Sequence, residues 1–384
     1  MTTFNYNFRY FITRLYQPGS TPNPVIAELP FTGVNFTQQL NSAGTFQGHV
    51  LLSGLNATSM NLYDSTTPGL SILWIVYSDS EEGYNLPVWS GVIWQRDYNS
   101  TTQSLSISAQ EMISLYNRRR ISVTKNYTSP PKDPTYIAKD LLQYAESKTH
   151  GNTGLQYASV PSSGVLTTKT YNGYELKSVN QAIKDLSQNY FDYKISPEID
   201  SNGNLINKFY MGCPLGQIYQ ATNPLCNVLQ LPGNIIEYNF PEDAGSAANV
   251  LYGLGTGYNN SKIIVTATST DYITSGSWPL LEDTASYNDI PDTNLVKDLT
   301  LGQLKATAYP PTTVQVVLSP YVDPVYPIYN IGDEIRLDIK DDYFPNGLTG
   351  LVLRIVGISV NPGENGPARV TLTLTRQLTQ GTVS

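Results

Sequence analysis

Short segments with β-strand patterning recur at both ends of the 384-residue chain, and they constrain its fold more than any other feature. Each is rich in β-branched and aromatic residues, and clusters of Gly, Asn, Ser and Pro separate them. The N-terminal set covers residues 45–52, 71–77, 88–94 and 104–109, and the C-terminal set covers 313–318, 333–339, 349–358 and 369–375. Residues 104–108 alternate strictly between polar and apolar side chains, which indicates a strand with one solvent-exposed face. The sequence therefore predicts a mainly β protein.

Helical patterns are confined to the middle of the chain and to one later stretch. Asp133 and Pro134 have the residue types favoured at the N-cap and at the first position of a helix. We expect helices over 109–117, from 134 to about 148, over 175–189 and within 292–308, and further strands at 191–195, 234–240, 249–253 and 262–267. The helices therefore belong to smaller α/β modules set among the strands.

Two hairpins share one plan. Residues 91–108 and residues 350–374 each contain a nearly continuous apolar strand, a polar turn and then a strictly alternating strand. Hairpins are common in unrelated β proteins, so the likeness alone does not establish an internal duplication.

The composition limits the kinds of partner. Only 14% of the residues are charged, whereas a soluble domain usually has about 25%, so the surface must be mainly neutral and polar. The net charge of −8 argues against a protein that binds nucleic acid by neutralising phosphates. No apolar run reaches the roughly 20 residues that span a bilayer, and the first residues lack the layout of a signal peptide. We expect a protein that is made in the cytoplasm without an export signal.

The sequence contains no residue pattern typical of a catalytic or metal-binding site. The two histidines, His49 and His150, lie far apart and have no Cys, Asp or Glu at metal-ligand spacing. Residues 253–257, Gly-Leu-Gly-Thr-Gly, resemble part of a dinucleotide fingerprint, but a strand follows them where that site needs a helix. The acidic pairs at 81–82, 242–243 and 341–342 fall in turns. We expect no catalytic activity, no cofactor and no metal.

Other unusual residues have two interpretations each. Trp74, Trp89 and Trp94 lie in apolar strands, which favours core packing over a sugar-stacking platform. The arginines at 118–120 fit a solvated helix end near the negative end of its dipole, or a contact with an acidic partner. Cys213 and Cys226 fit one disulfide or two free buried thiols equally well.

Several local phrases, taken in order, resemble the baseplate-hub or tail-hub proteins of tailed bacteriophages. They are the phrase at 89–94 (Trp-Ser-Gly-Val-Ile-Trp), the alternating strand after it, the helix patterns at 109–116, 134–142 and 174–183, Phe-Asp-Tyr at 191–193, the phrase at 248–257 and the Gly-Asp-Glu turn at 332–334. The resemblance runs from about residue 30 to residue 376. It is a match of order and character rather than of one diagnostic motif.

The resemblance implies two tail-tube-like β-barrels in one chain, with smaller inserted modules, and the two similar hairpins are what such a duplication would leave. The implied divisions are a first β-barrel at 1–120, an α/β insertion module at 121–225, the start of the second β-barrel at 226–258, a helix-containing insertion at 259–310 and the remainder of the second barrel at 311–384. Because the sequence ends directly after the last strand, we expect no fused lysozyme, peptidase or spike domain.

The resemblance also implies a structural virion protein: a homotrimeric tail-tip hub that adapts the sixfold tail tube to a threefold tip. Its implied partners are the tail tube or distal tail protein ring, the tape-measure protein, a central spike or fibre protein, and DNA that passes without specific binding. We expect a channel wall with more Asp, Glu, Asn, Ser and Thr than Lys and Arg, and residues 118–120 turned toward a neighbouring subunit or an outer ring. The alternative is a receptor- or carbohydrate-binding β protein of a phage tail.

Overall fold

The structure, a computed structural model, divides the chain into two compact units. Unit 1 comprises Met1–Gln217, Ser319–Gly332 and Gly357–Thr371, and unit 2 comprises Ile218–Leu318, Asp333–Val356 and Leu372–Ser384. The residues described are 7–15, 24–52, 61–79, 84–219, 228–269, 278–288, 290–307, 313–320, 322–323, 325–363, 367–376 and 382–383. Antiparallel strands dominate both units, so the predicted mainly β fold is confirmed.

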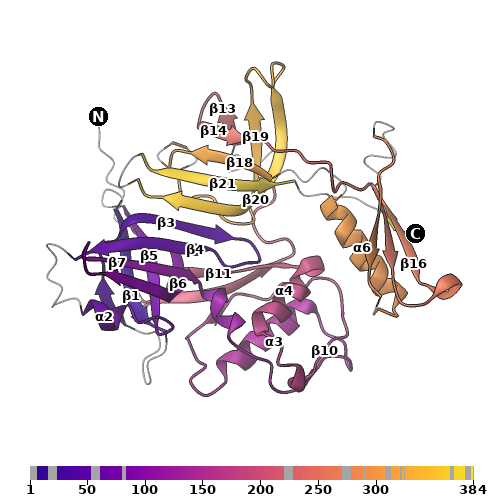
Figure 1. Cartoon of the computed structure of the whole chain (residues 1–384), viewed down its shortest axis with the longest axis horizontal. Coiled ribbons are helices and arrows are strands. Elements are labelled where there is room, and N and C mark those ends of the chain that lie inside the picture. Colours follow the sequence, from indigo (N-terminus) through magenta and orange to yellow (C-terminus); the bar gives the residue numbers. More distant parts are fainter. Residues whose placement is uncertain are drawn as a thin grey trace. The chain divides into compact units, whose positions relative to one another are not determined.

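The main sheet of unit 1 has the strand order β3–β4–β7–β6–β5–β1–β2, and each strand runs antiparallel to its neighbours (Figure 1). Its strands are β1 (Asn7–Arg14), β2 (Val25–Glu28), β3 (Thr32–Gln39), β4 (Thr45–Leu51), β5 (Ser71–Asp79), β6 (Tyr84–Asn99) and β7 (Ser104–Glu111). The short helix α2 (Leu62–Ser65) precedes β5. Residues 357–360 of β20 (Leu348–Asn361) pair antiparallel with β3 and extend this sheet.

Both faces of this sheet are buried where β5 and β6 cross it, which explains why their sequences are nearly continuously apolar. On one face, Phe46 packs against Phe31 and Trp89 with ring centroids 5.2 and 5.8 Å apart. On the other face, Ile72 and Trp74 belong to a second core. Strand β7, by contrast, buries only alternate residues, as its alternating sequence predicted.

An α/β layer supplies the rest of that second core. It consists of α3 (Pro134–Glu146), α4 (Val179–Tyr190), β11 (Asp192–Ile199) and β12 (Leu205–Gly212). The two helices pack together (Figure 1). Ile137 of α3 and Ile183 of α4 are fully buried in the core that contains Trp74. Short pieces complete the layer: β8 (Lys125–Asn126), β9 (Gln156–Tyr157), β10 (Thr170–Tyr171) and the 3₁₀ helices η1 (Met112–Asn117) and η2 (Gly173–Glu175).

The helix predictions were right for α3 and needed correction for two others. Asp133 caps α3, with its side chain accepting from the Thr135 N–H, and Pro134 is the first helical residue. The helix expected over 109–117 is wrong in its first part: the strand continues to Glu111, and only a 3₁₀ helix follows. Backbone and side-chain bonds between Glu111 and Gly44 hold this residue in the sheet.

The second correction concerns the start of α4, which was expected at residue 175. Ser178 is the N-cap, its side chain accepting from the Gln181 N–H at 3.2 Å, so the helix begins at Val179. Leu176 stands before it in the left-handed region with φ of 49°, which no α-helix accommodates.

Unit 2 contains two groups of strands. In the first, β13 (Val228–Leu231) lies parallel to β19 (Glu334–Ile339), which pairs antiparallel with β20, and β14 (Ile235–Asn239) pairs antiparallel with β18 (Thr313–Leu318). Strand β21 (Arg369–Thr375) neighbours β18 and β20. The second group is a separate sheet in the order β17 (Glu282–Ser286), β15 (Val250–Leu254), β16 (Ile264–Thr268) and β22 (Thr382–Val383).

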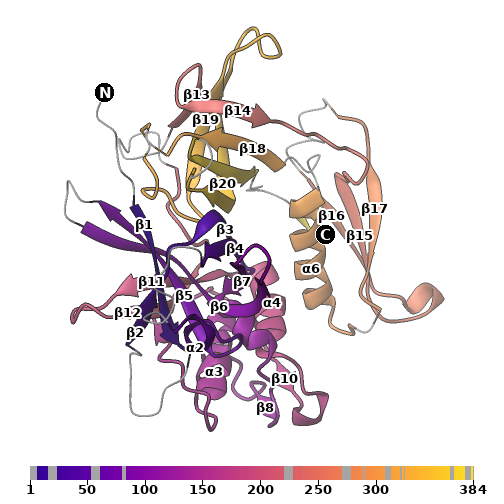
Figure 2. The ribbon, with the colours of Figure 1, turned by 60° about the vertical axis from the view of Figure 1, so that its left-hand side comes forward.

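Helix α6 (Thr293–Thr307) covers one face of that second sheet (Figure 2). Leu304 of the helix packs with Leu251, Ala267 and Ala285 of the strands. The helix expected within 292–308 is therefore confirmed. Strand β15, which the sequence grouped with the start of the second barrel, pairs with β16 and β17 of the stretch at 259–310.

The two similar hairpins are both built from neighbouring strands. Strands β6 and β7 pair antiparallel, and β20 and β21 are hydrogen-bonded neighbours. In each pair the second strand buries alternate residues: Leu105 and Ile107 in β7, Val370 and Leu372 in β21. The expected superposition of the hairpins stays a prediction, and so do the five domain divisions.

Candidate functional site

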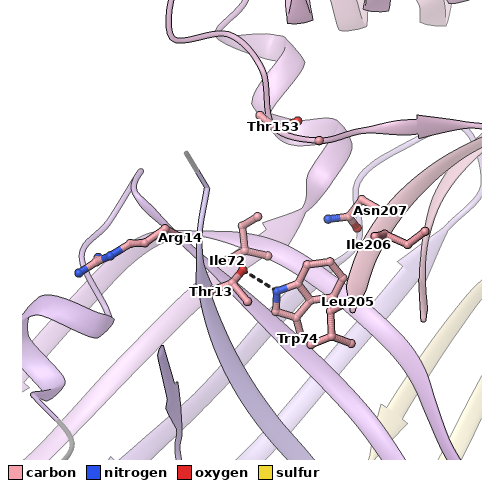
Figure 3. A pocket seen from close by; sticks show the side chains of 9 residues that line it. Thr13, Arg14, Ile72, Trp74, Thr153, Leu205, Ile206 and Asn207 are labelled. Carbon is pink, nitrogen blue, oxygen red and sulfur yellow. Dashed lines mark hydrogen bonds between the residues drawn. The ribbon is translucent and has the colours of Figure 1, made fainter. Parts of the chain in front are cut away.

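A small cavity of unit 1 lies between the main sheet and the α/β layer (Figure 3). Its lining comes from Thr13, Arg14, Ile72, Trp74, Thr153, Gly154, Leu205, Ile206 and Asn207. The Trp74 indole N–H donates to Thr13 Oγ1 at 2.9 Å, and the Ser90 hydroxyl donates to Asn207 Oδ1 at 2.5 Å. The space suits about one water molecule rather than a substrate. We therefore interpret the cavity as part of the packing between two layers.

The residues considered for catalysis are not brought together. His49 lies in β4, while the exposed His150 follows α3 in the left-handed region with φ of 58°. Within the described ranges, no three His, Cys, Asp or Glu side chains are grouped so that they could hold a metal ion.

Two of the three acidic pairs can be located, and both lie in loops outside the helices and strands. Glu242 and Asp243 are exposed. Asp341 accepts the Tyr238 hydroxyl at 2.5 Å and two backbone N–H groups of its own turn, and this bonding keeps the pKa of Asp341 below its ordinary value. The pair at 81–82 lies outside the described residues.

The glycines at 253–257 serve close packing and a turn. A Cβ on Gly253 would stand 1.9 Å from Thr300 Oγ1 of α6, so the helix can approach β15 only over a glycine. Gly257 has φ of 113° and lies against the Ser261 carbonyl in the connection to β16. The connection leads through the 3₁₀ helix η3 (Asn259–Ser261) into a strand, so the expected turn between strands is confirmed.

The core interpretation of the tryptophans is also confirmed. Trp74 and Trp89 are buried, and Trp94 is partly buried against the second core. Each indole N–H has an internal acceptor: Thr13 Oγ1, the Thr37 carbonyl and Ser114 Oγ respectively. These rings therefore offer no platform for stacking a sugar.

The arginines at 118–120 have separate environments. Arg119 donates to the Ala145 carbonyl at 3.3 Å and the Gly151 carbonyl at 3.2 Å, at the C-terminal end of α3. It thus stabilises the end of a different helix from the one the sequence suggested. The Arg118 guanidinium lies over the Trp94 ring, and Arg120 is exposed.

Cys213 is a free, exposed thiol, so the interpretation as a buried thiol, one of the two that the sequence left open, does not hold for it. Cys226 lies outside the described residues. Across the described chain, no helix combines the length and the apolar character that crossing a membrane requires.

Sequence reasoning missed the buried carboxyl of Glu111. Its Oε2 accepts from the Gly44 N–H at 2.6 Å. Burial raises the pKa of Glu111 to about 8, although the bonds from the Gly44 and Gln39 backbone and the charge of Lys194 oppose the rise. Glu111 follows the alternation of β7, so its inward direction was predictable from the strand period, but its bond to the β3–β4 turn was not.

Sequence reasoning also missed a surface feature of α3. Lys132, Tyr136, Asp140, Tyr144 and Lys148 recur every four residues in the sequence. Tyr136, Asp140 and Tyr144 lie in α3 outside its buried positions, and the two lysines stand just before and just after the helix. Lysine ammonium groups lie over both tyrosine rings. The four-residue spacing could have revealed this stripe.

Similar solved structures cover almost the whole chain. The 43 kDa tail protein of prophage MuSo2 from Shewanella oneidensis matches with a TM-score of 0.59 and 10% identity, over 96% of this chain and 98% of that one. The tail protein from Neisseria meningitidis MC58 matches with a TM-score of 0.57 and 12% identity, over 97% of both chains. The chain has the fold of phage tail proteins.

The same fold occurs within a larger chain of the Francisella PdpA–VgrG complex, with a TM-score of 0.59 and 10% identity. There the match covers 98% of this chain and 54% of the other. No protein-family model matches the sequence, and no curated protein matches it at the level of sequence either. The likeness is therefore one of fold.

Proposed function

We propose that this chain is a structural protein of a phage tail tip. The observation that carries the proposal is the fold match to two tail proteins, from N. meningitidis and the MuSo2 prophage, along nearly the full length of all three chains. The role fits a surface with few charges, buried tryptophans and a cavity too small for a substrate. On this proposal the protein is a virion component without catalytic activity.

The finer proposal is a homotrimeric hub. Each subunit would contribute two tube-like barrels, bounded as the sequence suggested, so that three subunits continue a sixfold tube and present a threefold tip. The similar hairpins β6–β7 and β20–β21 support this duplication by their common pattern of burial. The tube or distal tail ring, the tape-measure protein and a spike or fibre protein are the proposed neighbours, and DNA is proposed to pass through the central channel without specific binding.

Electron cryomicroscopy of the purified chain tests the hub. The expected result is a threefold ring with six barrels around a channel whose wall has more acidic and neutral polar groups than Lys and Arg. A monomer at every concentration, or a ring without six barrels, would contradict the proposal. A positively charged channel wall would contradict only the proposal that DNA passes through the channel without binding.

A further inference from the structure

Two tyrosines of α3 and three lysines from β8 and from the residues just before and after the helix form a linked set of side chains, which we call the lysine–tyrosine ladder. It consists of Lys125, Lys132, Tyr136, Tyr144 and Lys148. The buried stripe of α3 lies in the second core through Ile137, Leu141, Leu142 and Ala145. Lys132 and Lys148 flank the two ends of α3, whose 13 residues are about 20 Å long at 1.5 Å per residue.

Cation–π contacts order the ladder. The Lys132 ammonium lies 5.3 Å from the ring centroid of Tyr136. Those of Lys125 and Lys148 lie 5.1 and 4.6 Å from the centroid of Tyr144. Lys125 also pairs with Asp140 at 2.9 Å. Because these side chains are already held in place, a partner that binds them has little conformational entropy left to remove.

An exposed apolar anchor stands at one end of the ladder. The backbone groups of Lys132 and Thr167 exchange two hydrogen bonds of 3.1 and 2.9 Å, which brings Leu166 beside the ladder. The exposed fraction is 70% for Leu166 and 48% for Tyr136. Tyrosine is enriched at protein interfaces, so Tyr136 is the stronger anchor of the two.

The positive charge of the ladder favours an acidic partner surface. Unit 2 of this chain has such a surface. Residues 118–148 contain seven basic and three acidic residues, although the whole chain has a net charge of −8. Unit 2 contains 14 acidic and seven basic residues. At the edge of its second sheet, β17 presents Glu282 and Asp283, both exposed. A closed ring needs two different, complementary patches on each subunit, and these two patches meet that need.

We propose that the lysine–tyrosine ladder docks against the β17 edge of unit 2 in a second copy of this chain. The inference rests on the proposed homotrimer and names its contact. Nucleic acid fits less well as the occupant, because the net charge of −8 on the whole chain repels phosphates.

Charge reversal in the full chain tests the contact, with mass photometry and analytical ultracentrifugation as the readouts. Lys132→Glu with Lys148→Glu is expected to raise the dissociation constant of the trimer by about tenfold or more, and so is Glu282→Lys with Asp283→Lys. Combining both pairs is expected to restore assembly, since the charges are exchanged rather than lost. The matched control is Lys169→Glu with Lys184→Glu, two exposed lysines of the same layer, which is expected to leave assembly unchanged.

Circular dichroism establishes that each variant is folded. A wild-type trimer that none of the reversals weakens would overturn this inference and leave the proposed hub intact. If both double variants weaken the trimer but the chain that combines them does not recover assembly, the pairing of the ladder with β17 is overturned. A wild-type chain that never trimerises would overturn both proposals. DNA binding by the wild type that is lost on ladder reversal, with the trimer unchanged, would assign the ladder to nucleic acid instead.

Discussion

Replacing Glu111 by Gln is expected to remove most of the pH dependence of the stability of unit 1. The Glu111 carboxyl is fully buried, and its pKa is raised from 4.5 to about 8. The folded protein therefore keeps a proton that the unfolded chain releases. The stability from this group is complete below the unfolded pKa of 4.5 and is lost as the pH rises toward 8. A rise of about 3.5 units at about 1.4 kcal/mol each lowers the free energy of unfolding by about 5 kcal/mol across that window.

Urea unfolding followed by tryptophan fluorescence at a series of pH values measures this effect. Trp74, Trp89 and Trp94 belong to unit 1, so the signal reports mainly on the unit that contains Glu111. Glutamine keeps an acceptor for the Gly44 N–H but cannot ionise, and the variant is expected to show a nearly flat profile. The control is Glu175→Gln, an exposed glutamate of the same unit, whose profile should match the wild type. A flat wild-type profile, or an equal slope in the Glu111→Gln variant, would refute the reasoning.

Three further outcomes follow from particular contacts. Gly253→Val is expected to lower the free energy of unfolding by about 2 to 3 kcal/mol, because its side chain would collide with Thr300 of α6. Thermal unfolding measures the loss, and an unchanged stability would mean that the helix does not pack there. Asp133→Ala removes the N-cap of α3 and is expected to cost about 1 to 2 kcal/mol in urea unfolding, whereas Asp133→Asn should cost much less. Arg119→Met removes one bond to a carbonyl in the last turn of α3 and one to the loop after it, and is expected to speed amide hydrogen exchange in that last turn, while Arg120→Met should not.

The features that the sequence predicted are those that depend on local pattern. The cap at Asp133 and Pro134 and the apolar stripe of α3 lie within one helix, and both were predicted. The alternation in β7 likewise follows from a single strand with one wet side. Core tryptophans were predicted because apolar neighbours flank them in the same strand.

The features that were missed depend on residues far apart in the chain. Residues 109–111 have the composition of a helix start, but the distant Gly44 binds both the backbone and the side chain of Glu111 and keeps it extended. Arg119 stabilises α3 through the carbonyl of Ala145, 26 residues away. The need for glycine at position 253 is set by Thr300 of α6. No local pattern records such contacts.

The sheet of unit 1 has a further consequence for how the molecule comes apart. Ile72, Trp74 and Val92 face the helices, while Trp89 and Phe46 face the opposite side of the sheet. Removing the residues that pack on either face would therefore expose large apolar side chains to water. The helices of this unit are therefore required for the stability of its sheet. They should melt together with the strands in one transition, and a shortened chain that lacks them should aggregate. A recombination event that transfers this segment between related genes must carry the matching strands with it to leave a soluble product.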